Sequence, residues 1–254
     1  MSVSGGGDGS DRVVAELRDK VATACRILGH TGVAREITGH VSVRVPGRPR
    51  EILVRCRTES EAGLEATDVD AIRTVDLFTG TVDDPDAADV PLELPIHTGV
   101  LRAREDVVAV VHVHPRFCVL CGIAGVPLRP VYGAYDHHAS LLVEDGVPVF
   151  ESSVLVRDEP TAAALVAALG AAPVCLMRGH GITVVGASVE QATLRALRLE
   201  HLAEMTWDLH RAGYEGRLPA EEMEAFVSAR SQPVLPKGER WAWNYYARQV
   251  GGSP

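Results

Sequence analysis

Two histidines, His112 and His114, stand at the end of an apolar run that begins at Val107. Successive side chains of a β-strand point to opposite faces, so both imidazoles of a strand with this spacing lie on one face. Pro115 ends the run, because proline has no N–H to donate to a sheet ladder. The pattern predicts a metal site at the end of a buried strand. The alternative to a metal site is that one histidine is hydrogen-bonded in the core and the other faces solvent.

His180 is the strongest candidate for a third metal ligand. It follows an apolar segment, 174–178, that predicts a buried strand, and it has glycine on both sides. Glycine has no Cβ, so Gly179 and Gly181 would let another group approach the backbone closely. Three histidines with an open fourth position are what a catalytic metal needs. Alone, His180 would more often be structural; its value as a candidate comes from joining the other two histidines.

Glu93 is the candidate general acid/base. It precedes a predicted helix, 94–104, and stands in apolar surroundings. Burial would raise the pKa of this carboxyl towards the range useful for proton transfer, whereas a nearby cation would lower it. The alternative is a carboxylate that only interacts favourably with the helix dipole. His97 lies four residues further on, on the same helical face, where it could hydrogen-bond to Glu93.

The elements that must position these residues follow from the apolar periodicity and the turn residues. Helical spacing predicts helices over 11–28, 94–104, 117–123, 158–170 and 188–211. Alternating or continuous apolar runs predict strands over 39–45, 51–56, 71–77, 107–114, 148–150, 174–178 and 182–186. The candidate metal ligands therefore stand at the ends of predicted strands, and Glu93 stands at the start of a predicted helix.

No linker divides the 254 residues, so we expect one domain. Residues 1–10 are rich in glycine and serine and are expected to form a disordered tail. The domain itself should cover 11–232. An aromatic C-terminal extension, 233–254, would either fold over a cleft or a neighbouring subunit, or simply pack. The acidic segment 83–89 is expected to be a solvated loop.

Composition excludes several classes of partner. The chain is 46% apolar and 23% charged, as in ordinary soluble proteins, and its net charge is -9. This charge argues against nucleic-acid binding and against a polybasic membrane surface, so we expect a small-molecule partner. No apolar run reaches membrane length and no signal peptide is evident, which predicts a cytoplasmic protein. The five cysteines are expected to be reduced structural thiols, including the pair in Cys118-x-x-Cys121.

The order of the motifs resembles the class II aldolase/adducin family over residues 11–212. The motifs that carry the resemblance are Gly39-x-x-Ser42-x-Arg44, Glu93-x-x-x-His97, His112-x-His114-Pro115 and Gly179-His180-Gly181. The resemblance implies an α/β fold, a single three-layer α/β/α domain with a mixed, mainly antiparallel central sheet. It also implies a homotetramer with sites at subunit interfaces.

The resemblance further implies roles for individual residues. His112, His114 and His180 would ligate a divalent cation, zinc first, with manganese or iron as alternatives, and Glu93 would be the general acid/base. A tyrosine of a neighbouring subunit often assists in the aldolases, and Tyr132 and Tyr135 lie in the corresponding region. The sequence does not choose between these two. The substrate-binding candidates are Ser42, Arg44, His97, Tyr132 and Tyr135.

Departures from the family pattern indicate a substrate without phosphate. The sugar-phosphate enzymes of the family have two serines before the catalytic glutamate, where this chain has Pro91 and Leu92. His40 replaces the asparagine of the usual Gly-Asn-x-Ser turn. The segment 57–61, Arg-Thr-Glu-Ser-Glu, replaces a phosphate-binding loop and brings acidic groups where an anion would sit. The chain is more similar to the branch with decarboxylases of hydroxy-aromatic or heteroaromatic carboxylates.

The leading hypothesis is therefore a divalent-metal-dependent carbon–carbon lyase, an aldolase or a decarboxylase. Its substrate would be a small non-phosphorylated carboxylate or carbonyl compound, cleaved through a metal-stabilised enolate or carbanion. Three histidines can also hold Fe(II) for oxygen chemistry, so a non-haem Fe(II) oxygenase is the first alternative. A non-catalytic adducin-like binding module is the second, and the retained histidines and Glu93 argue against it.

Overall fold

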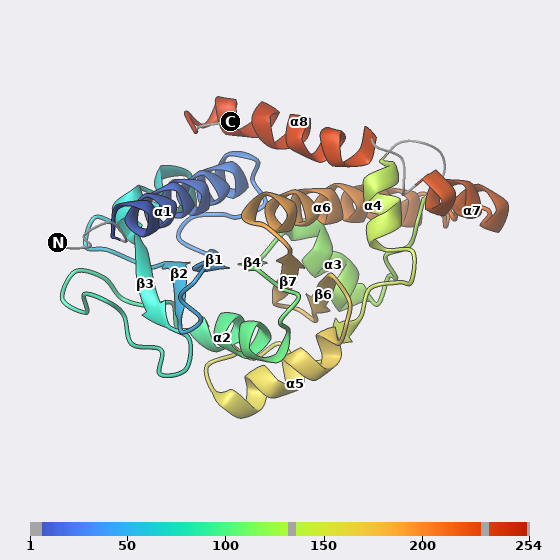
Figure 1. The fold of residues 1–254 in the computed structure, drawn as a ribbon. Helices are drawn as coiled ribbons and strands as arrows, with labels where there is room; N and C mark the ends of the chain where they lie inside the picture. The colour runs from blue at the N-terminus through green and yellow to red at the C-terminus, as the bar shows by residue number, and fades with distance from the viewer. Residues whose placement is uncertain (1–6, 132–135, 230–233, 253–254) are drawn as a thin grey trace.

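The structure, a computed structural model, describes residues 7–131, 136–229 and 234–252. A seven-stranded sheet with the order β3-β2-β1-β4-β7-β6-β5 forms its centre (Figure 1). Neighbouring strands run antiparallel, except β5 and β6, which run parallel. This confirms the mixed, mainly antiparallel sheet. The strands are β1 (His40–Arg44), β2 (Glu51–Arg55), β3 (Ile72–Asp76), β4 (Ala109–Val113), β5 (Val149–Phe150), β6 (Val174–Met177) and β7 (Gly181–Gly186).

Helices cover both faces of the sheet, which confirms the α/β/α layers (Figure 1). One face carries α1 (Gly7–His30), α3 (Arg116–Ala124), α4 (His137–Leu142) and α6 (Val189–Arg211). The other carries α2 (Leu94–Ala103) and α5 (Glu159–Leu169). Two short 3-10 helices, η1 (Leu64–Ala66) and η2 (Val69–Ala71), precede β3. Within the described residues, none of the helices combines the length and apolar character that crossing a membrane requires.

The alternation of side chains along β4 decides which face carries the site. Val111 and Val113 lie in the core beneath α1 and α6, whereas Val110 lies in the core beneath α2 and α5. His112 has the same parity as Val110, so it faces α2. On β1, Val41 also packs on the α1 side, which places His40 and Ser42 on the α2 side. The site therefore forms between the sheet and α2.

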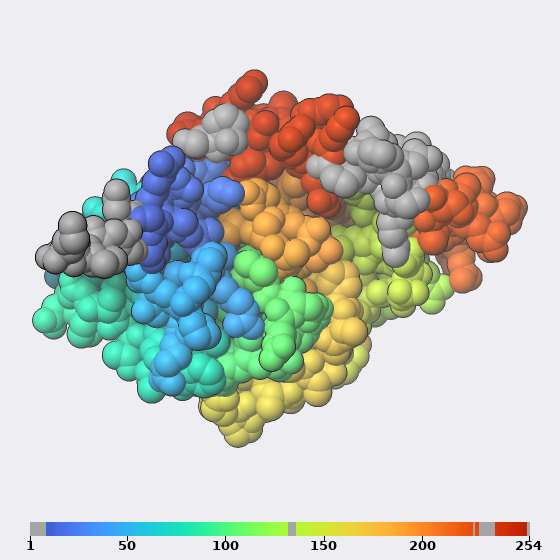
Figure 2. All heavy atoms as spheres, viewed as in Figure 1, coloured from blue at the N-terminus to red at the C-terminus, as the bar shows by residue number. Residues whose placement is uncertain are grey.

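At the ends of the chain, the first helix begins earlier than expected, and the C-terminal segment packs on the domain, which was one of the expected alternatives. Helix α1 begins at Gly7, inside the segment expected to be disordered, and residues 1–6 lie outside the described residues. The aromatic C-terminal segment forms a helix, α8 (Val234–Gln249), which lies outside α1 and α6 (Figures 1 and 2). Its Trp243 and Ala247 are buried in the same core as those helices. Helix α7 (Ala220–Ala229), which the sequence did not predict either, extends beyond α4.

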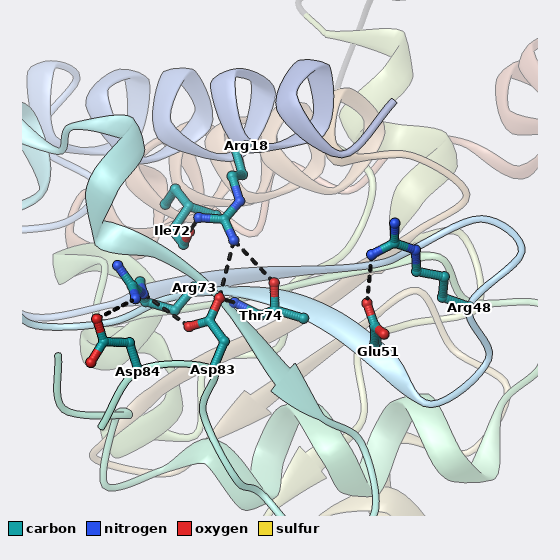
Figure 3. Close-up of polar contacts among 8 residues, drawn as sticks. All are labelled: Arg18, Arg48, Glu51, Ile72, Arg73, Thr74, Asp83 and Asp84. Atoms are coloured by element: carbon teal, nitrogen blue, oxygen red, sulfur yellow. Dashed lines mark hydrogen bonds and ion pairs between the residues drawn. The ribbon is translucent and has the colours of Figure 1, made fainter. Parts of the chain in front are cut away.

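Charged side chains tie helix α1 to the edge strand β3 (Figure 3). Arg18 donates to the carbonyl oxygen of Ile72 at 2.6 Å and to Thr74 Oγ1 at 3.0 Å, and it pairs with Asp83 at 3.2 Å. Arg73 pairs with the same carboxylate at 3.0 Å. Asp83 begins the acidic segment that was expected to be a solvated loop, and it is exposed while it pairs with both arginines. These contacts occupy the exposed edge of the sheet.

All five cysteines are free and buried. Cys118 and Cys121 are 1% and 0% exposed and belong to the core beneath α6. Burial raises the pKa of the Cys121 thiol to about 12, which keeps it protonated and unreactive. The interpretation of Cys118-x-x-Cys121 as a pair of core thiols is confirmed.

Candidate metal centre

Glu93, His112, His114 and His180 lie together at one end of the central strands. Each offers one ligand atom, and these four atoms all lie within 4.8 Å of one another. The Nε2 atoms of His112 and His114 are 3.0 Å apart. Glu93 Oε2 lies 3.4 Å from His112 Nε2 and 3.3 Å from His180 Nε2. The structure thus brings together the three predicted ligands and the predicted acid/base.

Backbone geometry around two glycines makes this convergence possible. A tight turn joins β6 to β7, closed by a hydrogen bond from His180 N–H to the Met177 carbonyl at 3.0 Å. Gly179 within it has a φ of 67°, a conformation that favours glycine. A Cβ on Gly181 would lie 2.4 Å from the Val113 carbonyl oxygen and 2.7 Å from His114 Cδ2. Only a glycine here lets the turn approach the end of β4.

Glu93 is held in place from two sides. It occupies the position just before the first residue of α2 and is 6% exposed. Its Oε1 accepts a hydrogen bond from the Val156 N–H at 2.9 Å, which leaves Oε2 facing the imidazoles. Burial opposes ionisation, but the contacts with His112 and His180 outweigh it and hold the pKa of the carboxyl well below its usual range. The sequence left open whether the pKa of Glu93 is raised or lowered, and the structure shows that it is lowered.

His97 does not hydrogen-bond to Glu93, contrary to the sequence expectation. Its Nδ1 lies 2.6 Å from Ser42 Oγ, and its Nε2 lies 2.7 Å from His40 Nδ1. His97 and Ser42 are both fully buried. The His40 ring stacks on that of His112, with the centroids 5.1 Å apart. The sequence analysis did not select His40, although strand alternation places it on the same face as Ser42 and pairs it with His112.

Arg44, a predicted substrate-binding residue, is occupied elsewhere. Its guanidinium donates to the carbonyl oxygens of Val107 at 2.8 Å and Arg104 at 3.2 Å, and also to that of Leu101. The last two carbonyls belong to the C-terminal end of α2, where a cation interacts favourably with the helix. The structure therefore corrects this prediction: Arg44 anchors the helix that presents Glu93. Tyr132 and Tyr135 lie outside the described residues.

A buried carboxylate on α6 supports the segment that follows His114. Glu200 is 8% exposed and accepts hydrogen bonds from the N–H groups of Phe117, at 2.9 Å and 3.1 Å, and Cys118, at 3.0 Å. These donors are free at the start of α3, because Pro115 supplies no side-chain cap. No local sequence pattern predicts this contact, since 82 residues separate Glu200 from Cys118.

The cluster fits a divalent cation. His180 Nδ1 and Nε2 and His112 Nδ1 are buried and have no hydrogen-bond partner among the residues that the structure describes. Such atoms cost free energy unless a partner satisfies them. Burial lowers the pKa of His112, and it lowers the pKa of His114 to about 4, so both rings are held neutral, the form that ligates metals. Imidazole nitrogens with a neighbouring carboxylate suit zinc, manganese or iron.

Residues 19–207 match the profile of the Class II Aldolase and Adducin N-terminal domain. The chain belongs to the class II aldolase and adducin family. It is 38% identical over 242 residues to a 3,4-dihydroxyphthalate decarboxylase of Terrabacter sp. (strain DBF63), covering 93% of this chain and 98% of that protein. A protein of the same name from Arthrobacter keyseri is 42% identical over 202 residues, which are 78% of this chain and 81% of that protein.

Solved structures of the class II aldolase and adducin family share the fold. An aldolase II superfamily protein from Pseudomonas syringae superposes with a TM-score of 0.80 at 24% identity, over 96% of each chain. Class II aldolases are divalent-metal-dependent, and this chain has a matching cluster of one glutamate and three histidines. Together with the decarboxylases and aldolases among its relatives, this supports a lyase of the class II aldolase type.

Proposed function

We propose that the protein is a divalent-metal-dependent decarboxylase of dihydroxy-aromatic carboxylates, with 3,4-dihydroxyphthalate as the first substrate to test. The convergence of Glu93, His112, His114 and His180 carries the proposal, because it supplies a metal centre and a carboxylate within 4.8 Å. The choice of substrate is supported by three 3,4-dihydroxyphthalate decarboxylases that are 38–42% identical to this chain.

The surroundings of Glu93 support a substrate without phosphate. Proline and leucine, the two residues before Glu93, have no side-chain donor, and Pro91 also lacks an N–H. In the segment 57–61, Glu61 pairs with the buried Arg55 and accepts a hydrogen bond from the Gly63 N–H at 2.7 Å. This carboxylate neutralises the arginine and disfavours a second anion there. These contacts support the proposal of a substrate without phosphate.

Exposed apolar residues are close neighbours of residues that form or support the cluster. Leu92 precedes Glu93 and is 65% exposed, and Leu155 precedes Val156, whose N–H binds Glu93. Ile123 is also exposed and lies close to Gly179 in the turn that carries His180. Exposed apolar side chains in one place mark a ligand or subunit contact. We propose that the chain forms a homotetramer in the cytoplasm, with sites at subunit interfaces.

His112, His114 and His180 would hold the cation, with zinc proposed first and manganese or iron as alternatives. When bound, such a cation supplies a Lewis acid for a chelated substrate oxygen and stabilises the negative charge that develops as a carbon–carbon bond breaks. Decarboxylation replaces a carboxylate with hydrogen, so a proton must reach the ring carbon as CO2 leaves. Glu93 is ionised because its pKa is held low, so it would take a proton from a hydroxyl of the substrate and deliver it to this carbon; its Oε1 is fixed by the Val156 N–H, and Oε2 is directed into the cluster.

The decisive experiment supplies 3,4-dihydroxyphthalate to the metal-loaded protein under nitrogen and under air. We expect equal release of CO2 and of a dihydroxybenzoate in both gases, and no reaction after a chelator has removed the metal. Activity that requires oxygen would identify an oxygenase instead. No CO2 release by a metal-loaded, folded protein would contradict the proposal.

A further inference from the structure

Three buried polar side chains form a hydrogen-bonded chain that ends beside the metal centre. Ser42 Oγ lies 2.6 Å from His97 Nδ1, and His97 Nε2 lies 2.7 Å from His40 Nδ1. Ser42 and His97 are 0% exposed and His40 is 7% exposed. Ser42 and His40 come from β1, whereas His97 comes from α2, so the chain crosses the interface between sheet and helix. None of its members belongs to the Glu93 and histidine cluster.

The hydrogen positions in this chain follow from Ser42. Among the described residues, His97 Nδ1 is the only acceptor within reach of its hydroxyl. A buried hydroxyl hydrogen without an acceptor is costly, so the Ser42 O–H donates to Nδ1. The single hydrogen of a neutral His97 then lies on Nε2 and is donated to His40 Nδ1. Burial lowers the pKa of His97 to about 3, in agreement with a neutral ring.

His40 must therefore carry its own hydrogen on Nε2. Its Nδ1 is an acceptor, and a neutral imidazole has one nitrogen of each kind. Nε2 makes no hydrogen bond to the described residues, and it is not one of their buried polar atoms that lack a partner. The free N–H of His40 is thus available to a ligand. The opposite tautomer would present a lone pair and would repel an anionic oxygen.

The position of His40 next to His112 is fixed by the backbone. His40 pairs with His112 across β1 and β4, and the two rings stack with an angle of 26° between their planes. The preceding Gly39 has a φ of 97°, and a Cβ there would lie 2.9 Å from Val113 Cγ1. A glycine at this position lets the start of β1 approach the end of β4 closely. The His40 ring therefore lies beside a metal-ligand candidate.

We infer that His40 is a substrate-binding residue whose Nε2–H donates a hydrogen bond to an anionic oxygen, a carboxylate or phenolate, of an aromatic substrate at the metal centre. Ser42 and His97 are positioning residues, because they decide which nitrogen of His40 carries the hydrogen. The class of substrate rests on the proposed function, whereas the direction of the hydrogen-bond chain rests on the contacts of these three residues alone.

The first test is a tautomer measurement that does not depend on activity. The zinc-loaded protein, labelled with 15N-histidine, is analysed by long-range 1H–15N NMR, and the signals of His40 and His97 are assigned by their loss in His40→Asn and His97→Gln. We expect hydrogen on Nε2 of both rings. Hydrogen on Nδ1 of His40, or on both of its nitrogens, would overturn the inference. The His40 signal alone decides the inference, so the test stands if His97→Gln does not fold, and His40→Gln replaces His40→Asn if that variant does not fold.

The second test measures binding of 3,4-dihydroxybenzoate to the zinc-loaded protein by calorimetry. We expect His40→Phe and Ser42→Ala to weaken binding about tenfold, the effect of losing a hydrogen bond to a charged group, with unchanged zinc content. Ser42→Thr keeps a hydroxyl and should keep most of the affinity. Unchanged affinity in His40→Phe, or no binding by the wild type, would overturn the inference. Normal binding without CO2 release from 3,4-dihydroxyphthalate would contradict only the proposed reaction.

Discussion

Glu93 Oε2 lies 3.4 Å from His112 Nε2, although the two residues come from different layers of the fold. Glu93 stands at the start of α2, and His112 stands near the end of β4 in the central sheet. The site therefore depends on how α2 is held against the sheet, and on how closely the β6–β7 turn approaches β4. Each dependence can be tested by substitution.

Glu93→Gln should retain the metal and lose turnover. The amide keeps the shape of the side chain and can still accept from the Val156 N–H, but it cannot carry a proton. We expect a loss of about 10²–10⁴-fold in kcat, the usual contribution of a general acid/base. Steady-state kinetics and metal analysis of the same preparation measure both properties. Full activity in this variant would remove Glu93 from the mechanism.

Gly181→Ala should disrupt the metal centre. The new Cβ would lie 2.4 Å from the Val113 carbonyl oxygen, so the turn that carries His180 must move away from β4. We expect weaker metal binding and a loss of free energy of unfolding of about 1–3 kcal/mol, as for overpacking. Gly9→Ala is the matched control, because nothing lies within 4 Å of its Cβ position. Equal metal affinity in both variants would count against this account of the turn.

Arg44→Met should lower stability without affecting substrate binding. The substitution removes the donors to the carbonyls of Leu101 and Arg104 and leaves most of the aliphatic stem. We expect the free energy of unfolding to fall by about 1–3 kcal/mol, with KM nearly unchanged. Arg12→Met is the control, since the Arg12–Glu16 pair is exposed and contributes little. A large rise in KM with unchanged stability would restore Arg44 as a substrate-binding residue.

Acid should destabilise the protein through its buried histidines. Burial lowers the pKa of His97 from 6.5 to about 3, so the unfolded chain takes up a proton near pH 6.5 that the folded chain refuses. Stability is therefore complete above pH 6.5 and is lost as the pH falls towards 3, by up to about 1.4 kcal/mol per pH unit for one such group. Urea unfolding with a chelator present, at pH 7.5 and pH 5, measures the slope. His97→Gln should unfold with a shallower pH dependence, and an unchanged slope would contradict this prediction.

The residues of the metal centre could be predicted because their positions follow from local rules. His112 and His114 share a face through the period of a strand, and the glycines around His180 indicate a close approach of backbones. Glu93 was selected from its place before a helix. In each case a pattern within a few neighbouring residues was enough to predict the position of the side chain.

Contacts between distant segments could not be predicted. His97 was expected to bond to Glu93, four residues away, but the packing of α2 on β1 gave it partners more than 50 residues away. Arg44 was a substrate-binding candidate as part of the motif Gly39-x-x-Ser42-x-Arg44, whereas in the structure the end of α2 supplies its acceptors. The aromatic residues of 233–254 left its packing open, because the surface that α8 covers is formed by the distant helices α1 and α6; in the structure Trp243 is 4% exposed.

The central claim is that His112, His114 and His180 hold a divalent cation. Its most direct test is the molar ratio of metal to protein chain, measured by elemental analysis after purification without added metal, for the wild type and for His112→Ala. We expect about one metal ion per wild-type chain, as for a three-histidine site, and nearly none in a folded variant. An equal metal content in the two proteins, or a metal-free wild type that takes up no zinc, would contradict the claim.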